Sequence, residues 1–217
     1  MLEEYRELAA DREHAVLAYR SDYEPLAPLL AGLRGRVVDV GGGPGLARHW
    51  LPASASYLAV EPEAAWLGQG WERLADAFPC LARPPACVRG VGERLPLRAA
   101  CADAVLSIFS LNHLVDPALG LAEMARVLRA GGRLVLVLED VPPRWSDLAA
   151  GGSYAVRDAA QRRRLRLRWL WTRLVGQRVQ PDHIAIRERD LGAWTAGLEL
   201  LERRWRGAYL CLVYGRR

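Results

Sequence analysis

Residues 37–45 read Val37-Val38-Asp39-Val40-Gly41-Gly42-Gly43-Pro44-Gly45, and the rest of the chain is arranged around them. The first four residues are mostly β-branched and apolar, which is the composition of a buried parallel strand. Glycines follow at once, and glycine lets another molecule approach the backbone closely. We expect residues 46–51 to open a helix. A strand, a glycine turn and a helix N-terminus together predict a nucleotide-type site at the carboxyl end of a strand.

Two common nucleotide motifs do not fit this turn. The dinucleotide fingerprint requires G-x-G-x-x-G/A, and Gly41 and Gly43 satisfy its first two positions, but Leu46 stands where a small residue is needed. A P-loop requires Gly-Lys-Ser/Thr, and the chain contains no lysine. An NAD-dependent oxidoreductase and a P-loop nucleotidase are therefore disfavoured.

The pattern acid-x-G-x-G-x-G resembles motif I of the class I S-adenosylmethionine (SAM)-dependent methyltransferases. SAM carries an ammonium and a sulfonium group and no phosphate, so a carboxylate beside the turn suits it. The resemblance implies SAM as cofactor, S-adenosylhomocysteine as product, and cofactor contacts from five residues of the motif: Asp39, Gly41, Gly42, Gly43 and Gly45.

A second acid supports the same resemblance. Residues 57–60 predict the next strand, which ends at Glu61-Pro62, 20 residues after Gly41. A carboxylate there can accept two hydrogen bonds from a ribose cis-diol, and the resembling family binds the SAM ribose with an acid at this position. Trp66 follows, and both stacking on the adenine and ordinary core packing remain open for it.

Three further segments match the family's pattern. Residues 90–97, G-V-G-E-R-L-P-L, resemble its G-D-A-E-x-L-P-F segment at the adenine; Gly92 and Glu93 match, whereas Val91 replaces the usual aspartate. Residues 102–109 resemble its F-D-x-V-x-S strand and include Ser107, a further cofactor candidate. Residues 123–134 resemble its structural E-x-x-R-V-L-x-P-G-G-x-L run. We expect the helix of this run to begin at the cap Asp116 with Pro117 as its first residue, and to end at Gly131-Gly132.

The carboxyl end of the 102–109 strand is where the methyl group would lie. We expect Phe109 and His113 to bind the acceptor there, with His113 as the candidate general base and His183 as the next. In the resembling family, N-terminal helices contribute to the substrate cavity, which makes Tyr19 a substrate-side candidate alongside Tyr23. Simple packing is the alternative for both tyrosines.

The whole chain is predicted to form one α/β domain, a doubly wound Rossmann-like seven-stranded sheet with its last strand antiparallel. Residues 1–35 form N-terminal helices, with Ser21 or Asp22 capping the second one, and residues 36–140 form the SAM-binding core. Residues 141–187 form a helical cap. Residues 188–217 supply the last helix and a closing hairpin, with strands at 198–205 and 208–214.

Composition narrows the class of protein and its expected location. With 217 residues and 51% hydrophobic residues the chain is predicted to be globular, and no apolar run approaches transmembrane length. Four scattered cysteines without a C-x-x-C pair predict reduced thiols, no metal site and a cytoplasmic location. The net charge of +5 permits an anionic partner without requiring nucleic acid.

We therefore predict a methyltransferase (EC 2.1.1.-) that acts on a small molecule. Residues 161–174 are predicted to form a basic amphipathic helix, whose apolar side carries Leu167, Leu170, Trp171 and Leu174. This helix is either a lid over the substrate or an ordinary surface helix with a solvated charged face. The alternatives are an RNA or protein methyltransferase that docks through this helix, and a SAM-binding module without catalysis. No N-P-P-Y-type signature follows the 102–109 strand, which argues against base N-methylation of that kind.

Overall fold

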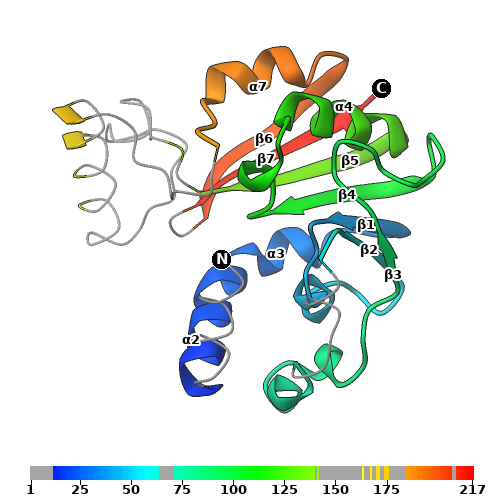
Figure 1. The fold of residues 1–217 in the computed structure, drawn as a ribbon, viewed down its shortest axis with the longest axis vertical. Helices are drawn as coiled ribbons and strands as arrows, with labels where there is room; N and C mark the ends of the chain where they lie inside the picture. The colour runs from blue at the N-terminus through cyan, green and yellow to red at the C-terminus, as the bar shows by residue number, and fades with distance from the viewer. Residues whose placement is uncertain are drawn as a thin grey trace.

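A computed structural model describes residues 12–63, 71–139, 141, 163, 167, 170, 171, 174, 175, 184–206 and 209–217. These residues form a seven-stranded sheet with the order β3-β2-β1-β4-β5-β7-β6 (Figure 1). The strands are β1 (Arg36–Val40), β2 (Ser56–Glu61), β3 (Cys87–Arg89), β4 (Ala102–Ile108), β5 (Leu128–Leu138), β6 (Leu198–Arg206) and β7 (Tyr209–Arg216). The first five strands are parallel, and β7 is antiparallel to both of its neighbours. The predicted doubly wound sheet with an antiparallel last strand is confirmed.

Helices cover both faces of this sheet (Figure 1). The α-helices are α2 (Arg12–Tyr23), α3 (Ala27–Leu30), α4 (Pro117–Val127) and α7 (Glu188–Trp194). The 3-10 helices are η1 (Glu24–Leu26), η2 (Leu46–His49), η4 (Glu72–Leu74), η5 (Pro79–Ala82) and η6 (Leu111–His113). In β5, Leu134, Leu136 and Leu138 pack with α4 and α7, whereas Val135 and Val137 pack with α3. The strand is apolar on both faces because successive side chains point to opposite sides of a sheet that is covered twice.

The prediction of a helix after the glycine turn is wrong about its length and type. Only the 3-10 helix η2 forms, from Leu46 to His49, and the chain then turns towards β2. Pro52 lies directly beyond, where it lacks a backbone N–H and disfavours a helical conformation at Leu51. The binding loop therefore leads into a single 3-10 turn, and no long helix directs its dipole at the site.

Two other boundaries also differ. Neither Ser21 nor Asp22 begins a helix: α2 continues to Tyr23, which places Asp22 within its last turn. The helix predicted to end at Gly131-Gly132 instead ends at Val127, and β5 begins at the next residue. The carbonyls of Arg126 and Val127 accept hydrogen bonds from Ala100 and Cys101 (3.0 and 2.8 Å), so pairing beside β4 replaces another helical turn.

The capping prediction for α4 is confirmed. Asp116 is the N-cap, its carboxylate accepts a hydrogen bond from Leu119 N–H (3.0 Å), and Pro117 is the first helical residue. The predicted cap region, 141–187, lies mostly outside the described residues. No helix among those that are described is long and apolar enough to cross a membrane.

Candidate functional site

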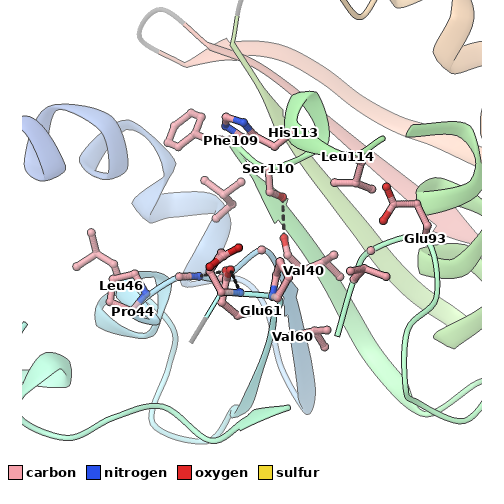
Figure 2. Close-up of a pocket in the computed structure, with 18 of the residues that line it drawn as sticks. Val40, Pro44, Leu46, Val60, Glu61, Glu93, Phe109, Ser110, His113 and Leu114 are labelled. Atoms are coloured by element: carbon pink, nitrogen blue, oxygen red, sulfur yellow. Dashed lines mark hydrogen bonds between the residues drawn. The ribbon is translucent and has the colours of Figure 1, made fainter. Parts of the chain in front are cut away.

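A cavity of about 390 Å³ lies at the carboxyl ends of β1, β2 and β4 (Figure 2). The strand order reverses at β1, because the chain continues from it to β2 and β3 on one side and then crosses to β4 on the other. This point of reversal leaves a crevice outside the strand ends, where open α/β sheets bind ligands. The volume falls within the range of about 300–1,000 Å³ for small-molecule sites.

The glycine loop forms one wall. Gly41, Gly43 and Gly45 all have positive φ values, of 69°, 50° and 77°, which L-residues rarely adopt. A Cβ on Gly41 would lie 2.5 Å from the Cβ of Ser110. Gly41, Gly42 and Gly43 line the cavity, whereas Gly45 lies beyond its edge and turns the chain into η2. The loop therefore presents bare backbone to the cavity.

Asp39 lies beneath this loop and does not line the cavity. Its carboxylate is buried, and Tyr57 donates a hydrogen bond to its Oδ2 (2.7 Å). Its Oδ1 accepts no hydrogen bond from the described residues. Burial raises the pKa of Asp39 to about 7, although the hydrogen bond from Tyr57 opposes that rise. A Cβ on Gly42 would lie 3.0 Å from the Asp39 Cγ, so the acid supports the loop from below.

Glu61 lines the cavity at the tip of β2 and is almost fully buried. Its Oε2 accepts a hydrogen bond from Gly43 N–H and its Oε1 accepts one from Glu63 N–H, both at 3.1 Å. Burial raises the pKa of Glu61, and the two backbone hydrogen bonds oppose that rise. The carboxylate is thus fixed against the glycine loop and faces the cavity, where a vicinal diol can reach it.

The segment after β3 closes the same end of the cavity. Val91, Gly92 and Glu93 of this segment line it, together with Pro62, which follows β2. The Glu93 Oε1 accepts hydrogen bonds from the N–H groups of Val115 and Asp116, at 2.7 and 3.2 Å. Glu93 therefore fastens this loop to the segment that precedes α4.

Two serines join the ends of β4 and β1. Ser110 lines the cavity, and its hydroxyl donates to the Val40 carbonyl (2.6 Å). Ser107 is fully buried outside the lining, and its Oγ lies 2.8 Å from the Oγ of Ser110. The structure therefore places Ser107 behind Ser110, one layer away from the cavity.

Phe109 and His113 lie together on the side of the cavity opposite Val60 (Figure 2). Phe109 has a φ of +56°, which is an unfavourable conformation for an aromatic residue. Its N–H donates to the Val137 carbonyl (3.0 Å), which holds it there. This backbone turns the Phe109 ring towards Tyr23 and Tyr209, whose ring centroids lie 6.0 and 4.4 Å from its own.

Helix α2 brings Tyr19, Asp22 and Tyr23 to the same cavity. Sequence reasoning missed Asp22 as a site residue. The Tyr209 hydroxyl donates to its Oδ1 (2.5 Å), and burial raises the pKa of Asp22 while this hydrogen bond opposes the rise. The spacing i, i+3, i+4 from Tyr19 was the available signal, because residues so spaced share one face of a helix. Two predicted site residues, Trp66 and His183, lie outside the described residues.

The chemistry of these groups fits SAM. Glu61 offers a carboxylate acceptor for the ribose hydroxyls, and the glycine loop offers close backbone approach to the methionine part. No group of three or more His, Cys, Asp or Glu residues in the described part of the chain has the arrangement of a metal site. Fold, loop and acid together define the class I methyltransferase architecture.

Comparison with known protein families gives a match to the centre of the chain. Residues 38–136 match the family described as "Methyltransferase domain". The resemblance predicted from the motifs of this central stretch is confirmed.

Among similar sequences, an uncharacterised methyltransferase of Mycobacterium tuberculosis is 36% identical over 138 residues, which are 61% of this chain and 53% of that protein. A demethylmenaquinone methyltransferase of a Mycobacterium species is 35% identical over 114 residues, which are 52% of this chain and 45% of that protein. The chain thus covers about half the length of these relatives.

Solved structures share the fold. A SAM-dependent methyltransferase of Thermotoga maritima superimposes with a TM-score of 0.60 at 19% identity, over 100% of both chains. A protein of Pyrococcus horikoshii gives a TM-score of 0.62 at 18% identity, over 92% of this chain and 91% of that one. These likenesses support the class I fold.

Proposed function

We propose that this protein transfers the methyl group of SAM to a small-molecule acceptor bound in the same cavity. One arrangement carries the proposal: Glu61 is held by the glycine loop at one side of a partly enclosed cavity, and the tyrosines of α2 line the other side together with Phe109, which follows β4. The first part suits the nucleoside and the second suits an apolar acceptor.

Methyl transfer from SAM requires few further groups from the protein. SAM supplies an activated methyl group, so catalysis depends mainly on aligning the acceptor with the methyl carbon in a dry site. Val40, Ile108, Phe109 and Leu114 provide apolar walls for that purpose. His113 lines the cavity and is the proposed general base where the acceptor must lose a proton.

A small acceptor is favoured over RNA or a protein because the cavity is bounded on several sides by α2, the glycine loop and the Val91–Glu93 segment. The alternative of a macromolecular substrate depends on the arginine-rich helix, most of which lies outside the described residues. Binding that weakens steeply with added salt would favour that alternative.

The test is calorimetric titration with S-adenosylhomocysteine of the parent protein, Glu61→Gln and Glu199→Gln. Glu199 lies on edge strand β6 and does not line the cavity, so its change is the matched control. We expect Glu61→Gln to bind at least tenfold more weakly, because a hydrogen bond to a charged group contributes about 1.5–3 kcal/mol. Failure of the folded parent to bind would overturn the proposal. Equal affinity in all three proteins would remove Glu61 from the site.

A further inference from the structure

The carboxylate of Asp22 is the one acid on the aromatic side of the cavity wall among the described residues. It is partly buried, and its Oδ1 accepts the hydrogen bond from Tyr209. No ion pair in the described part of the chain includes Asp22, although the protein has 30 arginines and a net charge of +5. Within the described residues, this carboxylate lies in the cavity wall without a cation beside it.

The surroundings of Asp22 are aromatic. Tyr19 and Tyr23 lie on the same helix, and Phe109 follows the last residue of β4; all three line the cavity. The Phe109 ring meets Tyr23 edge-on, at 88° between planes. Aromatic faces attract cations, and a partly desolvated carboxylate gains more from a cation than an exposed one does. This set of groups is complementary to a positively charged, partly apolar ligand.

The position of Asp22 separates it from the nucleoside end. Tyr209 is the first residue of β7, which lies two strands beyond β4, whereas Glu61 ends β2 on the other side of β1. Figure 2 shows Phe109 and His113 on one side of the cavity and Val60 on the other, with Glu61 nearer Val60. The Asp22 end is therefore the side on which an acceptor would meet the methyl group.

We propose that Asp22 selects a cationic amine as the acceptor, by pairing its carboxylate with the ammonium group while the rings of Tyr19, Tyr23 and Phe109 pack on the apolar part. The ammonium nitrogen has no lone pair, so it first gives a proton to His113, which lines the same cavity. The neutral nitrogen then forms its bond to the methyl carbon as the carbon–sulfur bond of SAM breaks, and S-adenosylhomocysteine leaves. Tyr209 is a positioning residue, because its hydroxyl fixes the orientation of the carboxylate. The proposal rests on the proposed methyltransferase function and adds the substrate class.

The test uses two probes of similar size, the cation phenethylamine and the anion phenylacetate, each titrated into protein saturated with S-adenosylhomocysteine. The variants are Asp22→Asn, which keeps the shape of the side chain, and Asp190→Asn on α7 as the matched control outside the cavity. We expect the parent and the control to bind phenethylamine at least tenfold more tightly than phenylacetate. Asp22→Asn should lose at least tenfold for phenethylamine while its affinity for S-adenosylhomocysteine changes less than twofold.

Tyr209→Phe distinguishes positioning from simple packing. Loss of a hydrogen bond that orients the carboxylate should weaken phenethylamine by several-fold and leave phenylacetate unchanged. A purely structural role would weaken both probes equally and would overturn the positioning assignment.

Each remaining outcome is decisive. Equal binding of phenethylamine by the parent and Asp22→Asn, or no binding to a parent that holds S-adenosylhomocysteine, overturns the amine proposal and leaves the methyltransferase proposal standing. A loss of S-adenosylhomocysteine affinity in Asp22→Asn would assign the carboxylate to the amino group of the cofactor, and this result also overturns the amine proposal. A parent that binds no S-adenosylhomocysteine overturns both proposals.

Discussion

Replacing Asp39 by asparagine should remove a loss of stability that the parent protein undergoes between pH 5 and pH 8. The native carboxyl has a pKa of about 7 because it is buried, against an ordinary value of 3.8 in the unfolded chain. For a raised pKa, the unfolded state releases its proton first, so stability is complete below pH 3.8 and falls as the pH rises towards 7. Asparagine has no proton to lose and removes this loss.

The magnitude follows from the two pKa values. Between pH 5 and pH 8, the carboxyl of the unfolded chain is almost fully ionised, while the native carboxyl changes from protonated to ionised. The parent should therefore lose about 3 kcal/mol of unfolding free energy over this interval through Asp39 alone. Other groups contribute equally to both proteins, so the difference between parent and Asp39→Asn isolates the effect.

The assay is urea denaturation followed by tryptophan fluorescence at pH 5, 6.5 and 8. Asp190→Asn serves as the control change. Tyr57→Phe should act in the opposite sense, because it removes the hydrogen bond that lowers the pKa of Asp39 and so extends the loss to higher pH. Parallel stability curves for the parent and Asp39→Asn between pH 5 and 8 would refute the reasoning.

Two further changes test the loop and a helix end. Gly41→Ala should lower the free energy of unfolding by at least about 1–2 kcal/mol because Gly41 has a positive φ, and it should weaken S-adenosylhomocysteine binding because the new Cβ would meet Ser110. Gly192→Ala is the contrasting change: its Cβ would meet nothing within 4 Å, so it should stabilise α7 by up to about 1 kcal/mol. Urea denaturation and calorimetry measure both, and an unchanged Gly41→Ala protein would contradict the close approach. Asp116→Ala should cost about 1 kcal/mol by freeing the Leu119 N–H, whereas Asp116→Asn should retain most of the cap; equal losses would show that charge and not capping matters.

Local patterns account for what could be predicted of the site. A carboxylate at a strand tip and glycines at a turn are visible along the chain, and the structure places Gly41, Gly42, Gly43 and Glu61 around the cavity. The orientation of Asp39 was not predictable in this way, because it depends on Tyr57 from the neighbouring strand. An acid in a motif indicates a location, but its partner decides whether it faces the ligand.

Asp22 shows the same limit more sharply. Its partner Tyr209 is 187 residues away along the chain, and the two meet only because β7 inserts beside β5 and the end of α2 lies over that edge. Hydrophobic periodicity gives the face that a helix buries, but not the groups on the opposing element. The sequence suggested that Ser21 or Asp22 caps a helix, whereas tertiary packing made Asp22 part of the cavity wall.

By itself, the sequence determined the sheet and its glycine turn, because β-branched runs, glycines and a capped helix start act through the backbone near each residue. It also determined the closing hairpin, whose two strands are adjacent along the chain. Only the tertiary structure decided which acids face the cavity and which support it, and which aromatic rings gather at its far side. Those outcomes depend on contacts between distant segments, and they exist only once burial and hydrogen bonding have fixed the whole fold.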